Sequence, residues 1–271
     1  MTAHPPAQPT ADDRPSRARR GWRAATRVEP PIAGVAGCLI LWWAIVEGLD
    51  VAPYLVPAPP AVLDAMRAWP GYLASHGRVT LTEALAGFAL ALLTALPVGA
   101  VLATSRWVYA AAMPSLLALN AIPKPALAPV LLATMGFGIA PKVVLVWLMA
   151  LFTITLATAT GLRQTPAELV ELSQALCATR LRTVWKIRLP AALPHLFVGV
   201  QQALPLALIG AVVAELFGGA EGLGFVIANA GTNADLAFAA IAILAAMSIT
   251  LHQLANLAQT VIAPWIHRTT N

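Results

Sequence analysis

The fold class is decided by the stretch Val143-Val-Leu-Val-Trp-Leu-Met-Ala-Leu-Phe-Thr-Ile-Thr-Leu-Ala-Thr-Ala-Thr-Gly-Leu162, which contains no charged residue. A helix needs about 20 largely apolar residues to span a bilayer, because unpaired backbone polar groups are too costly in hydrocarbon. We therefore predict an all-α, polytopic membrane protein of about six transmembrane helices. The other predicted spans are Ile32 to Leu49, Leu81 to Leu102, Tyr109 to Met135, Leu196 to Phe217 and Leu236 to Ile262.

The third predicted span is the least regular of the six. Asn120, Pro123, Lys124, Pro125 and Pro129 interrupt it. Proline removes a backbone donor and clashes with the preceding helical turn. We expect this span to be kinked or split.

Composition supports a protein that lies mostly in lipid. The 271 residues are 59% hydrophobic and 11% charged, with a mean hydropathy of +0.74, whereas soluble domains carry about 25% charged residues. The net charge of +5 does not indicate nucleic-acid binding, because the basic residues lie between the apolar runs. The two cysteines, Cys38 and Cys177, are isolated, so we predict neither a disulfide nor a metal site, and no cofactor.

Two regions differ in composition along the chain. Residues 1–30 are rich in Pro, Ala and Arg and are predicted to form a disordered basic tail. Residues 31–271 form the predicted transmembrane domain, with a polar loop at 163–195. No small-residue cleavage site follows the first apolar run, which is therefore expected to be an uncleaved anchor.

The distribution of Lys and Arg predicts the orientation, since these residues are enriched in cytoplasmic loops. With both termini in the cytoplasm, six of the 17 lie in the N-terminal tail, one at Arg106, five in the loop 163–195 and one near the C-terminus. The remaining four are Arg67 and Arg78 in the first predicted outer loop, Lys142 in the second, and Lys124 within the third span. We predict an inner-membrane protein with cytoplasmic termini.

The polar loop from Thr165 to Pro194 is longer than a simple connection requires. Thr165, Pro166 and Glu168 have the spacing of a capping box with proline at the first helical position. A second short helix is expected from Arg180 to Ile187, ended by Pro190 and Pro194. From the residues alone, this helix suits either a groove on another protein or an anionic lipid surface.

The same loop carries a family motif. It reads Glu171-Leu-Ser-Gln-Ala-Leu-Cys177-Ala-Thr-Arg-Leu-Arg-Thr-Val-Trp185-Lys-Ile187-Arg-Leu189-Pro190-Ala-Ala-Leu-Pro194. This segment resembles the EAA loop of binding-protein-dependent ABC permeases. Leu172 replaces a small residue of that pattern, and Cys177 stands where the family usually has glycine, at the turn between two short helices.

Three further fragments resemble the permeases for nitrate, alkanesulfonates and taurine. They occur in the family's order and at fitting distances, so the resemblance covers nearly the whole chain after the tail. The fragments are Leu55-Val-Pro-Ala-Pro59, Ala121-Ile-Pro-Lys-Pro-Ala-Leu-Ala-Pro129 with Gly136-Phe-Gly138, and Glu221-Gly-Leu-Gly-Phe-Val-Ile227.

The resemblance implies a type I ABC importer permease fold and a role in transport rather than catalysis. Its implied partners are a second copy of the permease, ATP-binding-cassette ATPase subunits and an extracytoplasmic substrate-binding protein. The sequence contains no GxxxxGK[ST] phosphate loop. The implied ATPase-coupling residues are Glu171, Cys177, Arg180, Leu181, Arg182, Val184, Trp185, Lys186, Ile187 and Pro190, with Glu171 expected to steady the base of the loop.

Lys124 and Asn120 are the candidate pathway residues, because an ionisable group inside a span often marks a route for solute. The resemblance implies a small solute, with an organosulfonate, taurine or a nitrate-like anion favoured and a thiamine pyrimidine precursor as the alternative. Glu47 and Glu215 are expected to be interfacial or structural, and His252 is expected to form a hydrogen bond to a neighbouring helix.

Two other classes of protein share some of these features. A secondary transporter or channel would also be polytopic, but it leaves the long loop unexplained. A membrane-embedded enzyme would need converging catalytic groups, and the sequence has no HExxH or GxSxG motif.

Overall fold

The structure is a computed structural model, and it describes residues 29–264. Every regular element in this range is helical, as the apolar periodicity predicts. The predicted N-terminal tail lies outside the described residues, except for Glu29 and Pro30. The chain divides into two compact units, Met1–Ala61 and Val62–Asn271.

The first unit contains helix α2 (Glu29–Gly48), at the position of the first predicted span. Its portion Gly34–Gly48 is apolar but shorter than a full crossing, so this span stays a prediction. Helix α3 (Pro59–Ala68) begins at the end of this unit and continues into the second. It matches the amphipathic helix that the sequence predicts, with Val62 buried and an exposed ion pair between Asp64 and Arg67.

In the second unit, four helices within the described range are long and apolar enough to cross a membrane. Each contains one of the predicted spans. The first begins at Pro70 rather than Leu81, because polar side chains in its first turns bond to other parts of the fold. The helices are α4 (Pro70–Thr104), α7 (Ile139–Arg163), α10 (Leu189–Gly218) with the preceding turn from Val184, and α12 (Ala234–Ile262).

The third predicted span is broken, as its prolines indicate. Helix α5 (Arg106–Ala121) is followed by the short turn η1 (Lys124–Leu127) and helix α6 (Ala128–Met135). The two halves meet at 72°. The break falls at Ile122 and Pro123, where the backbone is extended. Counting this pair as one crossing gives up to five spans in the described range.

The fifth span differs from the prediction at its start. Pro190 and Pro194 do not end a separate helix, because both lie inside α10, which begins at Leu189. Pro190 lies at the start of α10, directly after a π-helical turn, whereas Pro194 lies inside the helix. Arg180–Thr183 (α9) and a π-helical turn, Val184–Arg188 (η2), lead directly into α10. The loop is thus continuous with a membrane-spanning helix.

Small side chains allow α4, α7 and α10 to pack closely. A Cβ added to Gly87 of α4 would overlap Val146 of α7, and one added to Gly199 of α10 would overlap Ala157 of α7. The buried core between these helices is rich in alanine, including Ala91, Ala150 and Ala207. Since lipid tails are as apolar as leucine, close van der Waals contact is a main source of helix association here.

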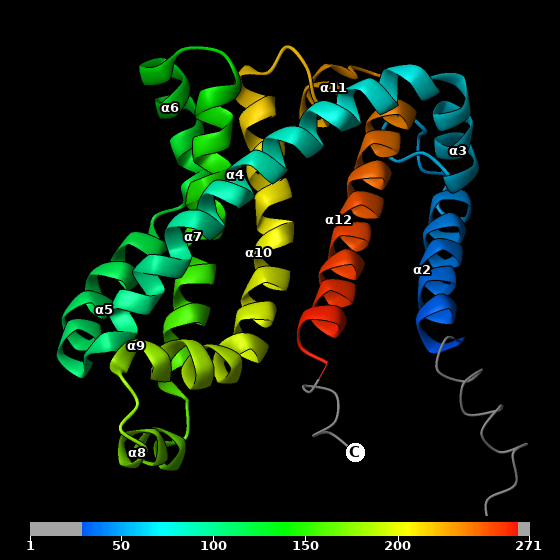
Figure 1. Ribbon diagram of the computed structural model, residues 1–271. Coiled ribbons are helices and arrows are strands. Elements are labelled where there is room, and N and C mark those ends of the chain that lie inside the picture. The colour runs from blue at the N-terminus through cyan, green and yellow to red at the C-terminus, as the bar shows by residue number, and fades with distance from the viewer. Residues whose placement is uncertain (1–28, 265–271) are drawn as a thin grey trace, which may run out of the picture. The chain divides into compact units, whose positions relative to one another are not determined.

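The second unit places its loops at two opposite ends (Figure 1). Helix α6, the segment 219–222 and helix α11 (Leu223–Asn229) lie at one end. The ends of α4 and α7, helix α8 (Ala167–Ala175) and the start of α10 lie at the other. Helix α8 lies farther out than α9 and is the most remote described helix at this end (Figure 1).

Candidate functional site

The first candidate site is the loop that joins α7 to α10, which we call the α8 loop (residues 164–188). Helix α8 begins at Ala167 with Glu168 in its first turn, as predicted. The predicted cap is wrong in detail, because the Thr165 hydroxyl donates to the carbonyl of Leu162, 3.2 Å away. The carbonyl of Pro166 instead accepts the first amide bond, from Leu169.

The turn after α8 is made by Cys177. Its φ is +53°, in the left-handed region where glycine is favoured. The chain therefore keeps the bend for which the family usually has glycine, and the cysteine carries a conformational cost of about 1 kcal/mol. The thiol itself is exposed.

The two arms of the loop are joined by hydroxyl groups. Ser173 Oγ on α8 and Thr183 Oγ1 on α9 are 3.1 Å apart, and both side chains are buried. Glu171, which was expected to steady this base, is instead exposed. The position of Ser173 in the family motif could have indicated that this residue matters. No neighbouring residue in the sequence indicates that Thr183 is its partner.

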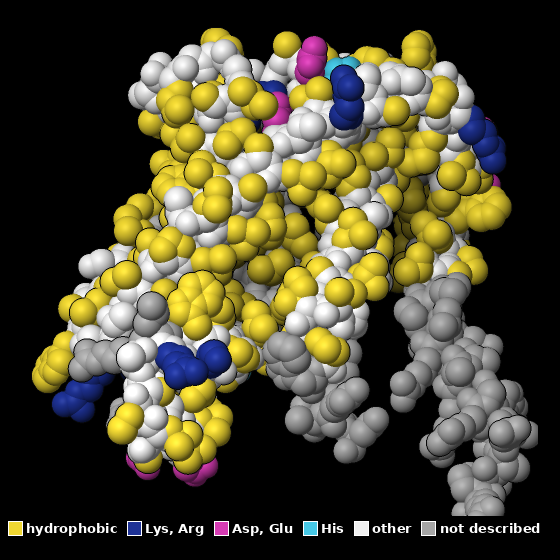
Figure 2. Space-filling view, in the orientation of Figure 1, with side chains coloured by type: hydrophobic (Ala, Val, Ile, Leu, Met, Phe, Trp, Pro, Cys, Tyr) yellow, Lys and Arg dark blue, Asp and Glu magenta, His cyan; other side chains and the backbone are white. Residues whose placement is uncertain are grey.

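Exposed apolar side chains form a stripe along α8. Leu169, Leu172 and Leu176 are 43%, 57% and 74% exposed and recur at positions i, i+3 and i+7. Glu168 and Glu171 are exposed on the same helix, and carboxylates lie at its outer tip (Figure 2). A helix with an unburied apolar stripe beside charges suits a groove on another protein.

The predicted residues on the other arm fall into two groups. Arg182 and Lys186 are exposed, and basic side chains gather there beside a large apolar one (Figure 2). Val184 and Trp185 line an apolar groove against α4 and α10, with Trp185 64% exposed. Ile187 and Pro190 are half-buried. The side chains of Arg180 and Leu181 lie outside the described part of the structure.

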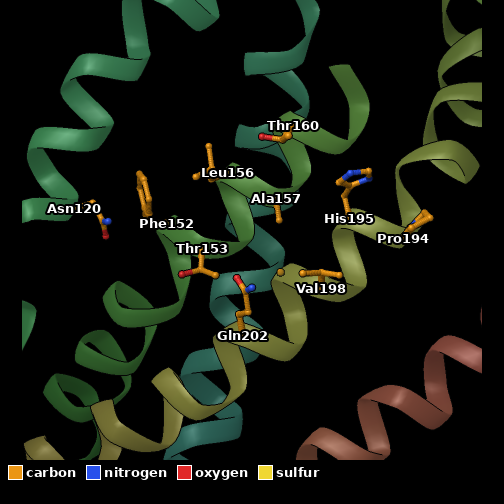
Figure 3. A pocket seen from close by; sticks show the side chains of 11 residues that line it. Asn120, Phe152, Thr153, Leu156, Ala157, Thr160, Pro194, His195, Val198 and Gln202 are labelled. Carbon is orange, nitrogen blue, oxygen red and sulfur yellow. The ribbon is translucent and has the colours of Figure 1, made fainter. Parts of the chain in front are cut away.

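The second candidate site is a cavity of about 460 Å³ between α5, α7 and α10 (Figure 3). Its polar lining includes Asn120, Thr153, His195 and Gln202, and Phe152 contributes an aromatic ring. The Gln202 side chain extends toward Thr153 (Figure 3). Nδ1 of His195 is buried without a hydrogen-bond partner in the described structure. Among the described residues, no carboxylate, Lys or Arg lines this cavity.

The two predicted pathway residues are in contact. Lys124 Nζ donates to Oδ1 of Asn120, 2.6 Å away. Both residues line a second, mostly apolar cavity of about 220 Å³, and Asn120 lines the first cavity as well. Lys124 forms no ion pair within residues 29–264. Asn120 therefore connects a cationic side chain to both cavities.

Comparison with known proteins identifies the chain. Residues 95–268 match the family described as binding-protein-dependent transport system inner membrane component. The chain belongs to this family. A probable ABC transporter permease of Haemophilus influenzae is 38% identical over 80% of this chain and 90% of its own length. A riboflavin transport system permease of Chloroflexus aurantiacus is 37% identical over 90% of this chain and 94% of its own.

The wider comparisons agree with the predicted fold and subgroup. The permease fold matches the MetNI methionine ABC transporter in an inward-facing conformation, with a TM-score of 0.63 at 21% identity, over 70% of this chain and 96% of that chain. Permeases named for taurine, aliphatic sulfonates and nitrate also match, at 26%, 28% and 25% identity. The chain is thus a membrane-spanning ABC importer permease, in a family whose ATPase is a separate subunit.

A buried polar cluster in this permease was missed at the sequence level. Lys142 was expected in an outer loop, but it is buried and donates to Glu83, 2.7 Å away. Glu215, also buried, accepts from the amide of Gly224 at 2.6 Å, consistent with its expected structural role. The sequence could have indicated this cluster through Glu83, because a carboxylate inside an apolar run is costly to bury unless it is paired.

The same cluster anchors the segment before α11. The amide of Gly222 donates to Nδ1 of His76 at 2.9 Å, and that of Leu223 donates to Oγ1 of Thr80 at 2.8 Å. His76 and Thr80 lie in the first turns of α4, upstream of the predicted start of the span. These bonds explain why α4 extends beyond the apolar run.

Proposed function

We propose that this permease forms one half of a dimeric pathway, with a second copy of itself as the other half. An extracytoplasmic binding protein would deliver the solute, and ATPase subunits would dock on the α8 loop. The observation that carries the proposal is the position of α8, which extends beyond the spans and bears an unburied leucine stripe. Family membership supports the same partners.

The structure supports a modified assignment within the loop. The segment Leu181 to Ile187, expected to be an isolated coupling helix, continues into α10 through η2. In the proposed mechanism, α8 with Glu171 contacts the ATPase. The arm containing Arg182, Trp185 and Lys186 passes the displacement to α10. A rigid connection without a loop suits movement of whole helices in alternating access.

Two substitutions test the docking assignment. We expect Glu171→Lys and Trp185→Asp to abolish uptake while the permease still inserts in the membrane. Glu171→Lys should also reduce co-purification of the ATPase. Asp64→Lys, the matched charge reversal on the exposed surface of α3, should retain the ATPase. Normal uptake and ATPase association in both loop variants would refute the assignment.

For the cargo, we propose a small anion such as a sulfonate, taurine or a nitrate-like ion. Lys124 supports this, because it is a cation without an ion pair in the described structure and lies beside cavities free of carboxylates. Replacing Lys124 with Gln should then lower uptake of the anion strongly.

A second candidate cargo is a planar nitrogen heterocycle, such as riboflavin or a thiamine pyrimidine precursor. The supporting observation is the cavity lining of Phe152 with the amides of Asn120 and Gln202, which suits a neutral ring. Competition for uptake separates the two candidates. Riboflavin uptake that is insensitive to Lys124→Gln and unaffected by taurine or nitrate would favour the heterocycle.

The proposed orientation places the α8 loop and both termini in the cytoplasm, as the positive charges predict. Cys177 provides the test because its thiol is exposed. In a Cys38→Ala background, a membrane-impermeant maleimide should label Cys177 in inverted membrane vesicles and not in intact cells. Labelling in intact cells would reverse the orientation.

A further inference from the structure

A polar cavity of about 210 Å³ lies where α4 and α7 end and the α8 loop begins. Arg163 from the last turn of α7 and Arg188 from η2 both line it. The hydroxyl-bearing side chains of Thr104 and Thr165 complete its polar wall. The cavity is separate from the two cavities beside Asn120 and from the leucine stripe of α8.

The charge in this cavity is uncompensated within the described structure. No carboxylate lines it, and neither arginine takes part in an ion pair there. Nε of Arg188 is buried without a hydrogen-bond partner. A guanidinium remains charged at any physiological pH, and an unpaired buried polar group is costly. Two cations that share a small polar cavity therefore favour an anion between them.

The hydrogen-bond donors available to such an anion come from the arginines. The Thr104 hydroxyl donates to the carbonyl of Val101 at 2.7 Å, and that of Thr165 donates to Leu162. Their hydrogens are therefore already used. The two arginines belong to different elements, α7 and η2, so a ligand that bonds to both needs several acceptor oxygens that point in different directions. A phosphate group meets this requirement and binds arginine through paired bonds.

The cavity also lies near the level expected for lipid headgroups. The Arg163 guanidinium lies over the ring of Tyr109, 4.2 Å from its centroid. Trp107, two residues before Tyr109, is 73% exposed, and the Arg106 guanidinium lies over its ring. Trp and Tyr concentrate at membrane interfaces, where basic side chains attract anionic lipids.

We propose that the cavity between Arg163 and Arg188 binds a phosphate group, either from an anionic lipid or from free inorganic phosphate. The bound phosphate joins the end of α7 to η2. It thereby stabilises the attachment of the α8 loop to the spans. This inference concerns binding alone and stands independently of the transported solute and of ATPase docking.

Two binding measurements on the full-length protein test the proposal and separate the phosphate sources. The first follows the melting temperature in phosphate-free detergent as inorganic phosphate is added. The second counts bound lipids by native mass spectrometry after reconstitution with phosphatidylglycerol or with phosphatidylcholine. The proposal expects a rise in melting temperature with phosphate, or selective retention of phosphatidylglycerol, or both.

Matched variants locate the site. Arg163→Gln and Arg188→Gln should each weaken the observed binding by about tenfold or more, as expected for loss of a charged hydrogen bond. Arg182→Gln removes the same charge from an exposed position in the same loop and should leave binding unchanged. If Arg188→Gln is not monodisperse, Arg163→Gln decides the test, because Arg163 is largely exposed.

The outcomes separate the possibilities. Phosphatidylglycerol retention without an effect of inorganic phosphate identifies a lipid site, and the reverse identifies a site for a soluble phosphate. Binding of neither probe overturns the proposal. Equal binding in the wild type and in both cavity variants also overturns it.

Discussion

The Lys142 ammonium lies 2.7 Å from the Glu83 carboxylate, and this buried ion pair joins α7 to α4. The second oxygen of Glu83 is buried and has no hydrogen-bond partner in the described structure. Neither charge of the pair can be removed singly without leaving the other unpaired in a low-dielectric environment.

Substitution of Glu83 by Gln should therefore strongly destabilise the permease. Loss of one partner of a buried pair costs about 3–5 kcal/mol, and we expect a large fall in melting temperature in detergent. Asp64→Asn is the control, because it breaks the exposed pair with Arg67, and such pairs contribute about 1 kcal/mol or less. Equal shifts in the two variants would contradict a stabilising role for the buried pair.

Gly222 should not tolerate a side chain. Its φ is +108°, and an added Cβ would overlap the carboxyl group of Glu215. Gly222→Ala should thus lower the melting temperature more than Gly136→Ala. Gly136 also has a positive φ, +78°, with ψ of 179°, so a side chain there meets backbone strain of about 1–3 kcal/mol, but an added Cβ meets no atom within 4 Å. Similar melting temperatures would show that the segment adapts.

Replacing Cys177 with Gly should stabilise the turn of the α8 loop by about 1 kcal/mol, because glycine adopts φ of +53° without steric strain. Hydrogen exchange of the loop amides should slow accordingly. The same substitution at Cys38, inside helix α2, should have the opposite sign, since glycine weakens a helix interior by about 0.5–1 kcal/mol. Faster exchange in Cys177→Gly would exclude strain at this position.

The leucine stripe of α8 should be required for ATPase binding. Leu172→Asp introduces a charge at a residue 57% exposed, so it should leave the permease folded and reduce co-purification of the ATPase at least tenfold. Leu63→Asp provides a matched control at a residue of α3 that is 52% exposed. Retention of the ATPase by Leu172→Asp would move the docking surface away from this stripe.

Features that depend on neighbouring residues were predicted well. The apolar runs predicted four long spans and the break in the third, because hydropathy and proline geometry act within a few residues. The motif around Cys177 predicted the turn for the same reason. The starts of α4 and α10 were less well predicted, since the partners of His76 and the continuity of Leu189 with η2 depend on the folded neighbourhood.

The buried cluster and the Arg163 cavity could not be predicted in this way. Lys142 and Glu83 are 59 residues apart, and Thr80 is 143 residues from Leu223. Each residue alone resembles an ordinary loop or interfacial polar group. Only the packing of α4 against α7 and of the α11 segment against α4 shows that their side chains are buried and paired.

The amino-acid sequence by itself determined that this protein crosses the membrane repeatedly, because the free energy of burial in lipid depends on the composition of each segment. It also determined that the chain carries a loop of the ABC permease type, because the motif is a contiguous run of residues. Tertiary structure alone decided which polar groups meet. It paired Lys142 with Glu83, joined Ser173 to Thr183 and placed Arg163 and Arg188 in the lining of one cavity. These contacts depend on how separate helices pack against one another, which no single segment of the sequence specifies.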